Sequence, residues 1–190
     1  MVGVYLVSAL ALAGSSSTAT IPRPVAGHPV LELRVGADRV DELRHPVVCA
    51  EGAPLSWLSF EACGTGAGIW HDDAEATDMA HFRARGRVAG ATSGRGTLDA
   101  LVGAGFLEVQ RTARDAPGFR FGRAREPDQV EAAGPELSAT VKGRWFVDPG
   151  ARTFLTADFN VGAAVVPAAP TVMGTGPVIP FALLSVGVGF

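Results

Sequence analysis

The chain has 190 residues, a length that fits a single domain. Its formal net charge of −3 argues against a nucleic-acid-binding protein, which would be basic. The 24 glycines, combined with only 18% charged residues, favour packed β-strands with small side chains over a helical protein. Mean hydropathy is positive at +0.24. Beyond the N-terminus, however, no run of about 18 uncharged apolar residues predicts a transmembrane helix.

The first segment, Met1–Ala19, is typical of a secretory signal peptide. An apolar stretch over Val2–Ala13 leads into small and hydroxyl residues, and both Ala11–Ala13 and Ser17–Ala19 fit an A-x-A-like cleavage site. The usual Lys or Arg near the start is missing, so a buried element of the mature fold is the alternative. We expect a signal peptide over residues 1–19 and one mature domain over residues 20–190.

Alternation of apolar and polar residues predicts the first strand from Val30 onward. Its two faces carry Leu31, Leu33, Val35 and Ala37 against Glu32, Arg34 and Gly36. Asp38–Pro54 is polar and interrupted, and it predicts a long loop that contains Cys49. Cys63–Trp70 is a glycine-rich strand candidate with Thr65, Ala67 and Ile69 outward, and His71–Ala76 is a polar turn.

The clearest strand inside the chain is Met79–Gly90. Its faces carry Ala80, Phe82, Ala84, Gly86 and Val88 against His81, Arg83, Arg85 and Arg87. A turn rich in Gly and Ser at residues 91–96 precedes a strand over Leu98–Leu107, in which Asp99 faces away from the apolar side. Phe119–Arg123 is a short strand candidate.

The last third of the chain predicts three more strands. Glu136–Val147 alternates well and is followed by a tight turn at Asp148–Gly150. The next strand spans Thr153–Val165, with Asp158 on its polar face, and a Pro-rich loop over residues 167–177 leads to the final strand, Ile179–Phe190.

The final strand ends on an aromatic residue and has one wholly apolar face, formed by Ala182, Leu184, Val186, Val188 and Phe190. This strand resembles the C-terminal strand of bacterial outer-membrane β-barrels. The resemblance implies that Leu184, Val186, Val188 and Phe190 are an assembly signal for the barrel-assembly machinery of a Gram-negative cell. It also implies contact of the inserted protein with outer-membrane lipids.

Together the strands predict an all-β fold, a closed antiparallel transmembrane β-barrel of about eight strands, similar in architecture to OmpA, OmpX and OmpW. Outer-membrane barrels have short periplasmic turns and longer external loops. With a periplasmic N-terminus, the external connections are residues 38–54, 91–96, 125–135 and 167–177. The periplasmic connections are residues 71–76, 111–117 and 148–150.

The polar faces of the strands predict a network of charges in the lumen. The expected members are Glu32, Arg34, His81, Arg83, Arg85, Arg87, Asp99, Glu136, Lys142, Arg144 and Asp158. An eight-stranded barrel is filled by its own side chains, and unpaired buried charges are costly. We therefore expect a plug of paired charges, with a small anion-selective channel around the arginines of Met79–Gly90 as the alternative.

Cys49 and Cys63 are the only cysteines. In an exported chain an even number of cysteines favours a disulfide, which here would join the first external loop to the strand after it. Two free thiols are the alternative.

No motif in the sequence predicts catalysis, and we expect no enzyme, metal or cofactor. A P-loop, a dinucleotide fingerprint and zinc-ligand spacing are missing, and His71–Asp73 is more typical of a solvated turn than of a metal site. The expected role is structural, adhesive or in surface interaction, with an extracellular partner that the sequence does not identify.

Two further hypotheses stay open. A secreted soluble β-barrel or sandwich that binds an apolar ligand would show the same alternation with the faces reversed. A lipid-modifying barrel enzyme would need a partner from a distant strand for His81 or Ser185.

Overall fold

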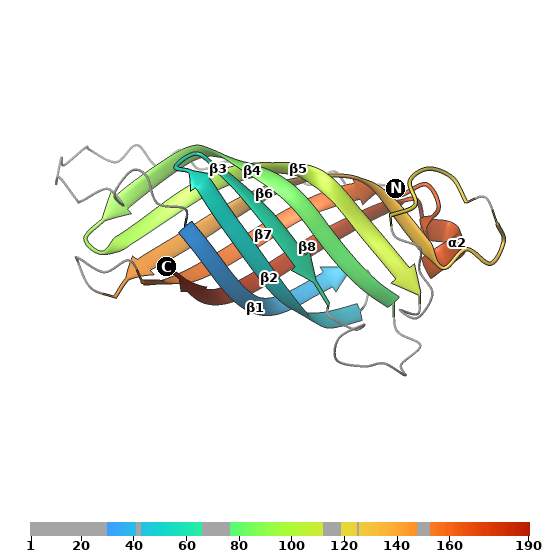
Figure 1. The fold of residues 1–190 in the computed structure, drawn as a ribbon, viewed down its shortest axis with the longest axis horizontal. Helices are drawn as coiled ribbons and strands as arrows, with labels where there is room; N and C mark the ends of the chain where they lie inside the picture. Colours follow the sequence, from blue (N-terminus) through green and yellow to red (C-terminus); the bar gives the residue numbers. More distant parts are fainter. Residues whose placement is uncertain (1–29, 41–42, 66–76, 112–118, 125, 148–152) are drawn as a thin grey trace, which may run out of the picture.

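The protein is an eight-stranded antiparallel barrel in which each strand pairs with its neighbours in chain order (Figure 1). The computed structural model describes residues 30–40, 43–65, 77–111, 119–124, 126–147 and 153–190. The strands are β1 Val30–Val40, β2 Leu43–Leu55, β3 Leu58–Gly64, β4 Thr77–Ser93, β5 Gly96–Arg111, β6 Glu131–Phe146, β7 Phe154–Val165 and β8 Val178–Gly189. The predicted fold class and strand number are confirmed. The predicted signal peptide lies outside the described residues.

The barrel closes where β1 pairs with β8. The N–H of Leu31 donates to the carbonyl of Phe190 at 3.0 Å, and the N–H of Phe190 donates to the carbonyl of Leu31 at 3.0 Å. The pairing continues along both strands, through Val35 opposite Val186, as far as Val40 opposite Phe181. This seam leaves the sheet without a free edge along the wall.

Side chains alternate between a buried inner face and an exposed outer face. In β7, Leu155 and Phe159 are 53% and 49% exposed, whereas Asp158 and Asn160 between the outward residues are buried. The final strand has the same pattern, with Leu184 and Val186 exposed and Ser185 buried. The apolar faces therefore point outward and the polar faces point into the lumen.

The two ends of the barrel differ in their connections. Two-residue turns, Ser56–Trp57 and Gly94–Arg95, lie at the end where Phe190 also lies. Gly94 adopts a φ of +56°, which glycine tolerates readily. We call this end the terminal end, and the opposite end, where β1–β2, β3–β4, β5–β6 and β7–β8 are connected, the loop end.

The predicted side of several connections is wrong. The turn at residues 91–96 was expected outside, but it lies at the terminal end. Residues 71–76 and 111–117 were expected in the periplasm. Apart from Arg111, these residues lie outside the described part of the chain, but the strand ends that flank them, Gly64 and Thr77 on one side and Arg111 and Glu131 on the other, lie at the loop end. One strand early in the chain was not predicted, so the expected directions of the strands that follow it are reversed. The false strand at Phe119–Arg123 adds one reversal, and the expected directions are correct again from β6 onward.

The missed strand is β2, in the segment predicted as the loop Asp38–Pro54. The first strand continues to Val40, and β2 pairs with it from Val40 opposite Leu43 to Val30 opposite Ala53. The inner face of β2 mixes Val47, Cys49 and Glu51, all of which are buried. This mixture of residue types hides the two-residue period on which the prediction rested.

Two predicted strands also need correction. Cys63–Trp70 is a strand only up to Gly64, and Thr65 is buried rather than outward, while residues 66–70 lie outside the described residues. Phe119–Arg123 is not a barrel strand, since it makes a single bridge between Phe121 and Ala133. Its aromatic rings instead pack on the outer wall, where Phe119 contacts Phe82 of β4 and Phe106 of β5.

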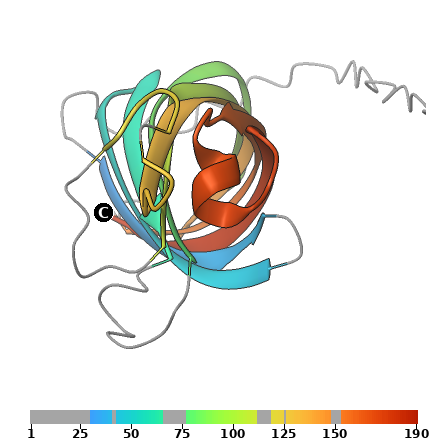
Figure 2. The ribbon, with the colours of Figure 1, turned by 90° about the vertical axis from the view of Figure 1, so that its right-hand side faces the viewer.

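A short helix, α2 (Ala169–Met173), covers the mouth of the barrel at the loop end (Figure 2). The predicted Pro-rich loop over residues 167–177 contains this helix. Val166, Ala169 and Val172 are fully buried. They belong to an apolar cluster with inward residues of the strands, including Leu107 and Phe181. The loop end of the lumen is therefore apolar.

No helix in the part of the chain that the structure describes is long and apolar enough to cross a membrane.

Candidate functional site

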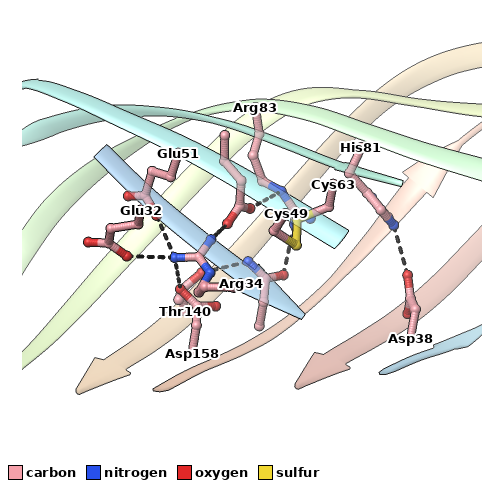
Figure 3. The surroundings of a disulfide bond; sticks show 12 residues. Glu32, Arg34, Asp38, Cys49, Glu51, Cys63, His81, Arg83, Thr140 and Asp158 are labelled. Carbon is pink, nitrogen blue, oxygen red and sulfur yellow. Dashed lines mark hydrogen bonds and ion pairs between the residues drawn. A yellow bond between two sulfur atoms is a disulfide. The ribbon is translucent and has the colours of Figure 1, made fainter. Parts of the chain in front are cut away.

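The lumen between the apolar cap and the terminal end holds a network of charged side chains from seven strands, β1 to β7. Arg34 of β1 lies at its centre (Figure 3). One guanidinium nitrogen of Arg34 donates to Glu32 at 2.9 Å and to Glu51 at 2.6 Å, and the other donates to Glu61. All four side chains are almost completely buried. Arg34 therefore ties β1 to β2 and β3 through the interior.

Arg85 and Lys142 connect the same carboxylates to the opposite wall. Arg85 of β4 donates to Asp158 of β7 at 2.9 Å and also to Glu51. Lys142 of β6 donates to Glu32 at 3.0 Å and to Glu51. Glu51 is thus shared by cations from β1, β4 and β6. Removing any one of them leaves a buried negative charge with fewer partners.

The network extends to the terminal end through Asp99 of β5. Arg144 donates to Glu32 and to Asp99, both at 2.9 Å. Arg87 approaches Asp99 at 2.9 Å, but its side chain is 41% exposed. It lies at the rim rather than in the lumen, because β4 continues past the end of β3 at this point.

Toward the loop end, His81 is held between two carboxylates from opposite walls. Its Nδ1 lies 2.6 Å from Glu136 of β6 and its Nε2 lies 2.9 Å from Asp38 of β1. Its ring meets Phe181 at a centroid distance of 4.6 Å, and the guanidinium of Arg83 lies 5.4 Å from the same phenyl ring. Phe181 is thus the boundary between the charges and the apolar cap.

The small inner face of β8 makes room for these long side chains. A Cβ atom at Gly187 would collide with the carbonyl of Leu33 and the backbone of Arg34, and one at Gly189 would enter the ring of Phe154. The face of the final strand that carries Gly and Ser is therefore matched to the bulky charged and aromatic residues beside it.

The geometry determines what this site can do chemically. Burying an ion costs several kcal/mol unless close partners compensate for the lost water. The carboxylates here meet guanidinium or ammonium groups, and Glu51, Glu61 and Asp158 lie close enough together to suggest a metal site. Arg34 and Arg85 occupy the space between them, so the group is organised for ion pairing rather than for a cation.

Known structures share this architecture, although no known protein family and no curated protein matches the sequence. Neisserial surface protein A matches with a TM-score of 0.50 at 11% identity, over 85% of this chain and 94% of that chain. The chain has the fold of the small outer-membrane β-barrels. The N-terminal β-barrel domain of Pseudomonas aeruginosa OprF matches with a TM-score of 0.44 at 13% identity, over 85% and 97% of the two chains. Ail of Yersinia pestis, the attachment invasion locus protein, matches with a TM-score of 0.37 at 11% identity, over 85% and 96%.

Within this outer-membrane-type barrel, the structure brings most of the predicted lumen residues into one connected network. Those that it places inside are Glu32, Arg34, His81, Arg83, Arg85, Asp99, Glu136, Lys142, Arg144 and Asp158. The predicted assembly-signal residues Leu184, Val186, Val188 and Phe190 all point outward on β8. Their role in assembly stays a prediction.

Sequence reasoning missed three buried carboxylates that the network depends on, Asp38, Glu51 and Glu61. Asp38 and Glu51 lie in the segment that was read as a loop, and Glu61 lies in the part of β3 that precedes the predicted strand Cys63–Trp70. Polar partners that were also missed are Asn160, which accepts a bond from Arg83 at 2.9 Å, and Thr140. Alternate residues of a strand share a face, so Glu51 lies on the same face as Cys49 and Glu61 on the same face as Cys63. This spacing was the signal that could have placed both carboxylates on the inner face.

The predicted disulfide between Cys49 and Cys63 is confirmed. It does not join a loop to a strand, because the two residues lie directly opposite each other on β2 and β3, with Cα atoms 4.0 Å apart. Both cysteines are buried in the lumen, where they form a small apolar cluster with Val47 and Leu183. The bond therefore belongs to the inner wall of the barrel.

Proposed function

We propose that the protein is an integral outer-membrane β-barrel with a structural or surface-interaction role and a lumen plugged by its own side chains. The observation that carries this proposal is the reversed distribution of side chains. Leu137 is 70% exposed on the outer wall, whereas Arg85 and Lys142 are 0% exposed inside. In a soluble barrel the two kinds of residue would occupy the opposite faces.

The outer wall supports insertion into a bilayer. Large apolar side chains are exposed on both sides of the seam and on the strand next to it. They include Leu33 and Val35 of β1, Val186 of β8 and Phe159 of β7. A soluble monomer rarely exposes a contiguous apolar surface of this kind. A lipid-facing band is the environment in which such a surface is stable.

Aromatic residues at both ends of this apolar wall are consistent with the two membrane interfaces. Trp57, Trp145 and Phe190 are exposed near the terminal end. Near the loop end, Phe106 stacks on Phe82 at a centroid distance of 5.1 Å on the outer wall. Outer-membrane barrels carry such aromatic girdles where the hydrocarbon meets the headgroups.

Cell fractionation tests the location. We expect the protein in the outer-membrane fraction, released by detergent and not by high salt or carbonate, and with a gel mobility that changes on heating. A monodisperse protein recovered from the periplasm without detergent would contradict membrane insertion.

The buried ion pairs support a plugged lumen. An ion that crossed the barrel would have to separate the contacts of Arg34 with Glu32 and Glu51 and displace the apolar cluster under α2. We expect no conductance above that of protein-free bilayers treated with the same detergent. A stable anion-selective open level in planar bilayers would contradict the plug and favour the channel hypothesis.

A role without catalysis fits the environment of the candidate groups. Both ring nitrogens of His81 face carboxylates, and Ser185 lies inside the barrel opposite Gly36 and Asp158 in the strand register. A lipid hydrolase would need such groups on the lipid-facing side. We expect no release of fatty acid from phospholipid vesicles, and release that stops in an S185A variant would contradict the proposal.

A surface-interaction role is supported by the connections at the loop end. The β5–β6 connection runs from Arg111 to Glu131, far longer than the two-residue turn between β4 and β5. Longer external loops are where barrels of this architecture present binding groups. We propose that the loop end faces outward from the cell.

A further inference from the structure

The hairpin of β4 and β5 has an open edge at the terminal end. Pairing between β3 and β4 ends with Leu58 opposite Gly86, whereas β4 continues to Ser93. The segment 88–93, which we call the open edge, pairs only with β5 among the described residues. Figure 1 shows this hairpin projecting beyond the rim at the end opposite α2.

Among the described residues, no second strand pairs with the backbone of the open edge. Ser93 and Gly96 are the first and fourth residues of a β-turn, so the carbonyl of Ser93 faces β5. Alternate residues of an antiparallel strand point to opposite edges, which directs the N–H and C=O groups of Gly90 and Thr92 away from β5. At the start of the edge, the N–H of Arg87 donates to the carbonyl of Trp57 at 2.9 Å. The sheet is thus continuous up to the point where its next strand is missing.

Features that normally protect a strand edge are missing from this one. The sequence of the open edge, Val-Ala-Gly-Ala-Thr-Ser, contains no charge and no proline. Two cations lie beside it: the guanidinium of Arg87 lies next to Gly90 and contacts Asp99, and Arg95 donates to the carbonyl of Val147 at 3.2 Å. An unprotected edge of this kind is a template for another strand.

We propose that the open edge binds an extended, acidic segment of a partner protein, which adds as a strand antiparallel to β4 and in line with β3. Main-chain hydrogen bonds would supply much of the affinity in this mode of recognition. The charge of the partner follows from the exposed charges nearby. Arg87 is 41% exposed at its side chain and Arg95 is exposed, whereas Asp99 is buried.

A second copy of the chain does not fit this edge in the antiparallel sense. Two barrels inserted in one membrane with the same orientation run their β4 strands in the same sense across the bilayer. Antiparallel pairing of two β4 edges under a two-fold axis would need opposite senses. This exclusion rests on the proposed membrane insertion, whereas the geometry of the edge does not.

Binding of synthetic peptides to the barrel folded in detergent tests the proposal independently of cellular location. The probe is a fluorescein-labelled heptapeptide of alternating threonine and valine with an aspartate at each end, and fluorescence polarisation measures its affinity. Its counterpart carries a lysine at each end. The matched variants are Thr92→Pro, which removes the N–H facing the edge, and Thr92→Ala, which keeps it.

We expect the acidic peptide to bind the wild type and Thr92→Ala within twofold of each other, and Thr92→Pro about tenfold more weakly. The basic peptide should bind more weakly than the acidic one. Equal binding to Thr92→Pro and Thr92→Ala, or equal binding of the two peptides, would overturn the proposal. So would a dimer in detergent that Thr92→Pro abolishes, or binding that appears only after residues 1–29 are removed, because these outcomes assign the edge to this chain itself.

Discussion

At the scale of single residues, Arg34 is the side chain on which the buried network depends most. It contacts carboxylates on β1, β2 and β3 and lies 3.5 Å from Asp158 of β7. Removing one partner of a buried ion pair is far more costly than never having the pair, because the remaining charge stays buried. The carboxylates around Arg34 would lose their shared counterion together.

An Arg34→Met variant should lose about 3–5 kcal/mol of unfolding free energy. Arg39→Met, on the outward-facing side of the same strand, should change it by less than about 0.5 kcal/mol. Urea titration of the folded barrel in lipid vesicles, followed by tryptophan fluorescence, measures both values. Equal stability of the two variants would mean that the lumen charges are compensated in another way.

Gly187 shows how closely the interior is packed. A methyl group there would meet the carbonyl of Leu33 and the backbone of Arg34, so Gly187→Ala should cost about 1–3 kcal/mol. The control is Gly86→Ala on β4, where nothing lies within 4 Å of the added atom. The same titration should find the control as stable as the wild type, and a cost common to both variants would point to strand propensity instead of packing.

At the scale of elements, β8 combines the seam of the barrel with the proposed assembly signal. Phe190 is hydrogen-bonded to Leu31 through its backbone while its side chain is 53% exposed. Phe190→Ser keeps those backbone bonds but should reduce the amount of folded barrel in the outer membrane several-fold. Heat-modifiable mobility of membrane extracts measures the folded fraction.

The control for this effect is Phe121→Ser, which removes a ring that is 54% exposed and lies outside the barrel strands. It should leave the folded fraction near that of the wild type. A similar loss in both variants would show that exposed aromatic surface matters in general and that the end of β8 carries no special signal.

Strands with one uniform apolar face were predictable, and strands with mixed faces were not. β6, β7 and β8 present mainly Leu, Val, Ala and aromatic residues outward, with Gly143 the one outward exception inside the predicted part of β6, so their period of two was visible. In β2 the outer face includes Pro46 and Pro54 and the inner face includes Glu51, a pattern that resembles a solvated loop. Its identity as a strand depends on pairing with β1, which sequence periodicity does not report.

The candidate site was predictable to the same extent as its strands. Cations on β4 and β6 were found because those strands were found, whereas Glu51 and Glu61 were lost with β2 and β3. The error left the predicted network with an excess of positive charge, which made an anion channel seem plausible. A buried cluster of arginines is itself a signal that unassigned acidic residues lie nearby.

At the scale of the whole molecule, the outer wall distinguishes a membrane protein from a soluble one. Phe159 lies in the middle of β7 and is 49% exposed, and Val178 begins β8 at the loop end and is 57% exposed. The cost of a charge on a lipid-facing wall depends on depth, at about 2–4 kcal/mol near the midplane and about 0–1 kcal/mol near the interface. Phe159→Arg should therefore cost more than Val178→Arg in vesicles.

Unfolding of both variants in vesicles and in detergent micelles measures this difference. The difference in unfolding free energy between the two variants should be larger in the bilayer than in micelles, because the bilayer imposes a defined depth on each residue. Equal costs for the two sites in vesicles would contradict a transmembrane orientation of the strands.

The disulfide has a consequence for the order in which the molecule is built. Cys49 and Cys63 are 0% and 2% exposed and face a lumen covered by α2 at one end. Both sulfurs are shielded from solvent in the closed barrel, and the two strands that carry them pair directly with each other. We therefore expect the cross-link to form on the open β2–β3 hairpin, in an oxidising compartment, before β8 pairs with β1. On this expectation, a disulfide found in the folded protein indicates that oxidation of the chain preceded closure of the barrel.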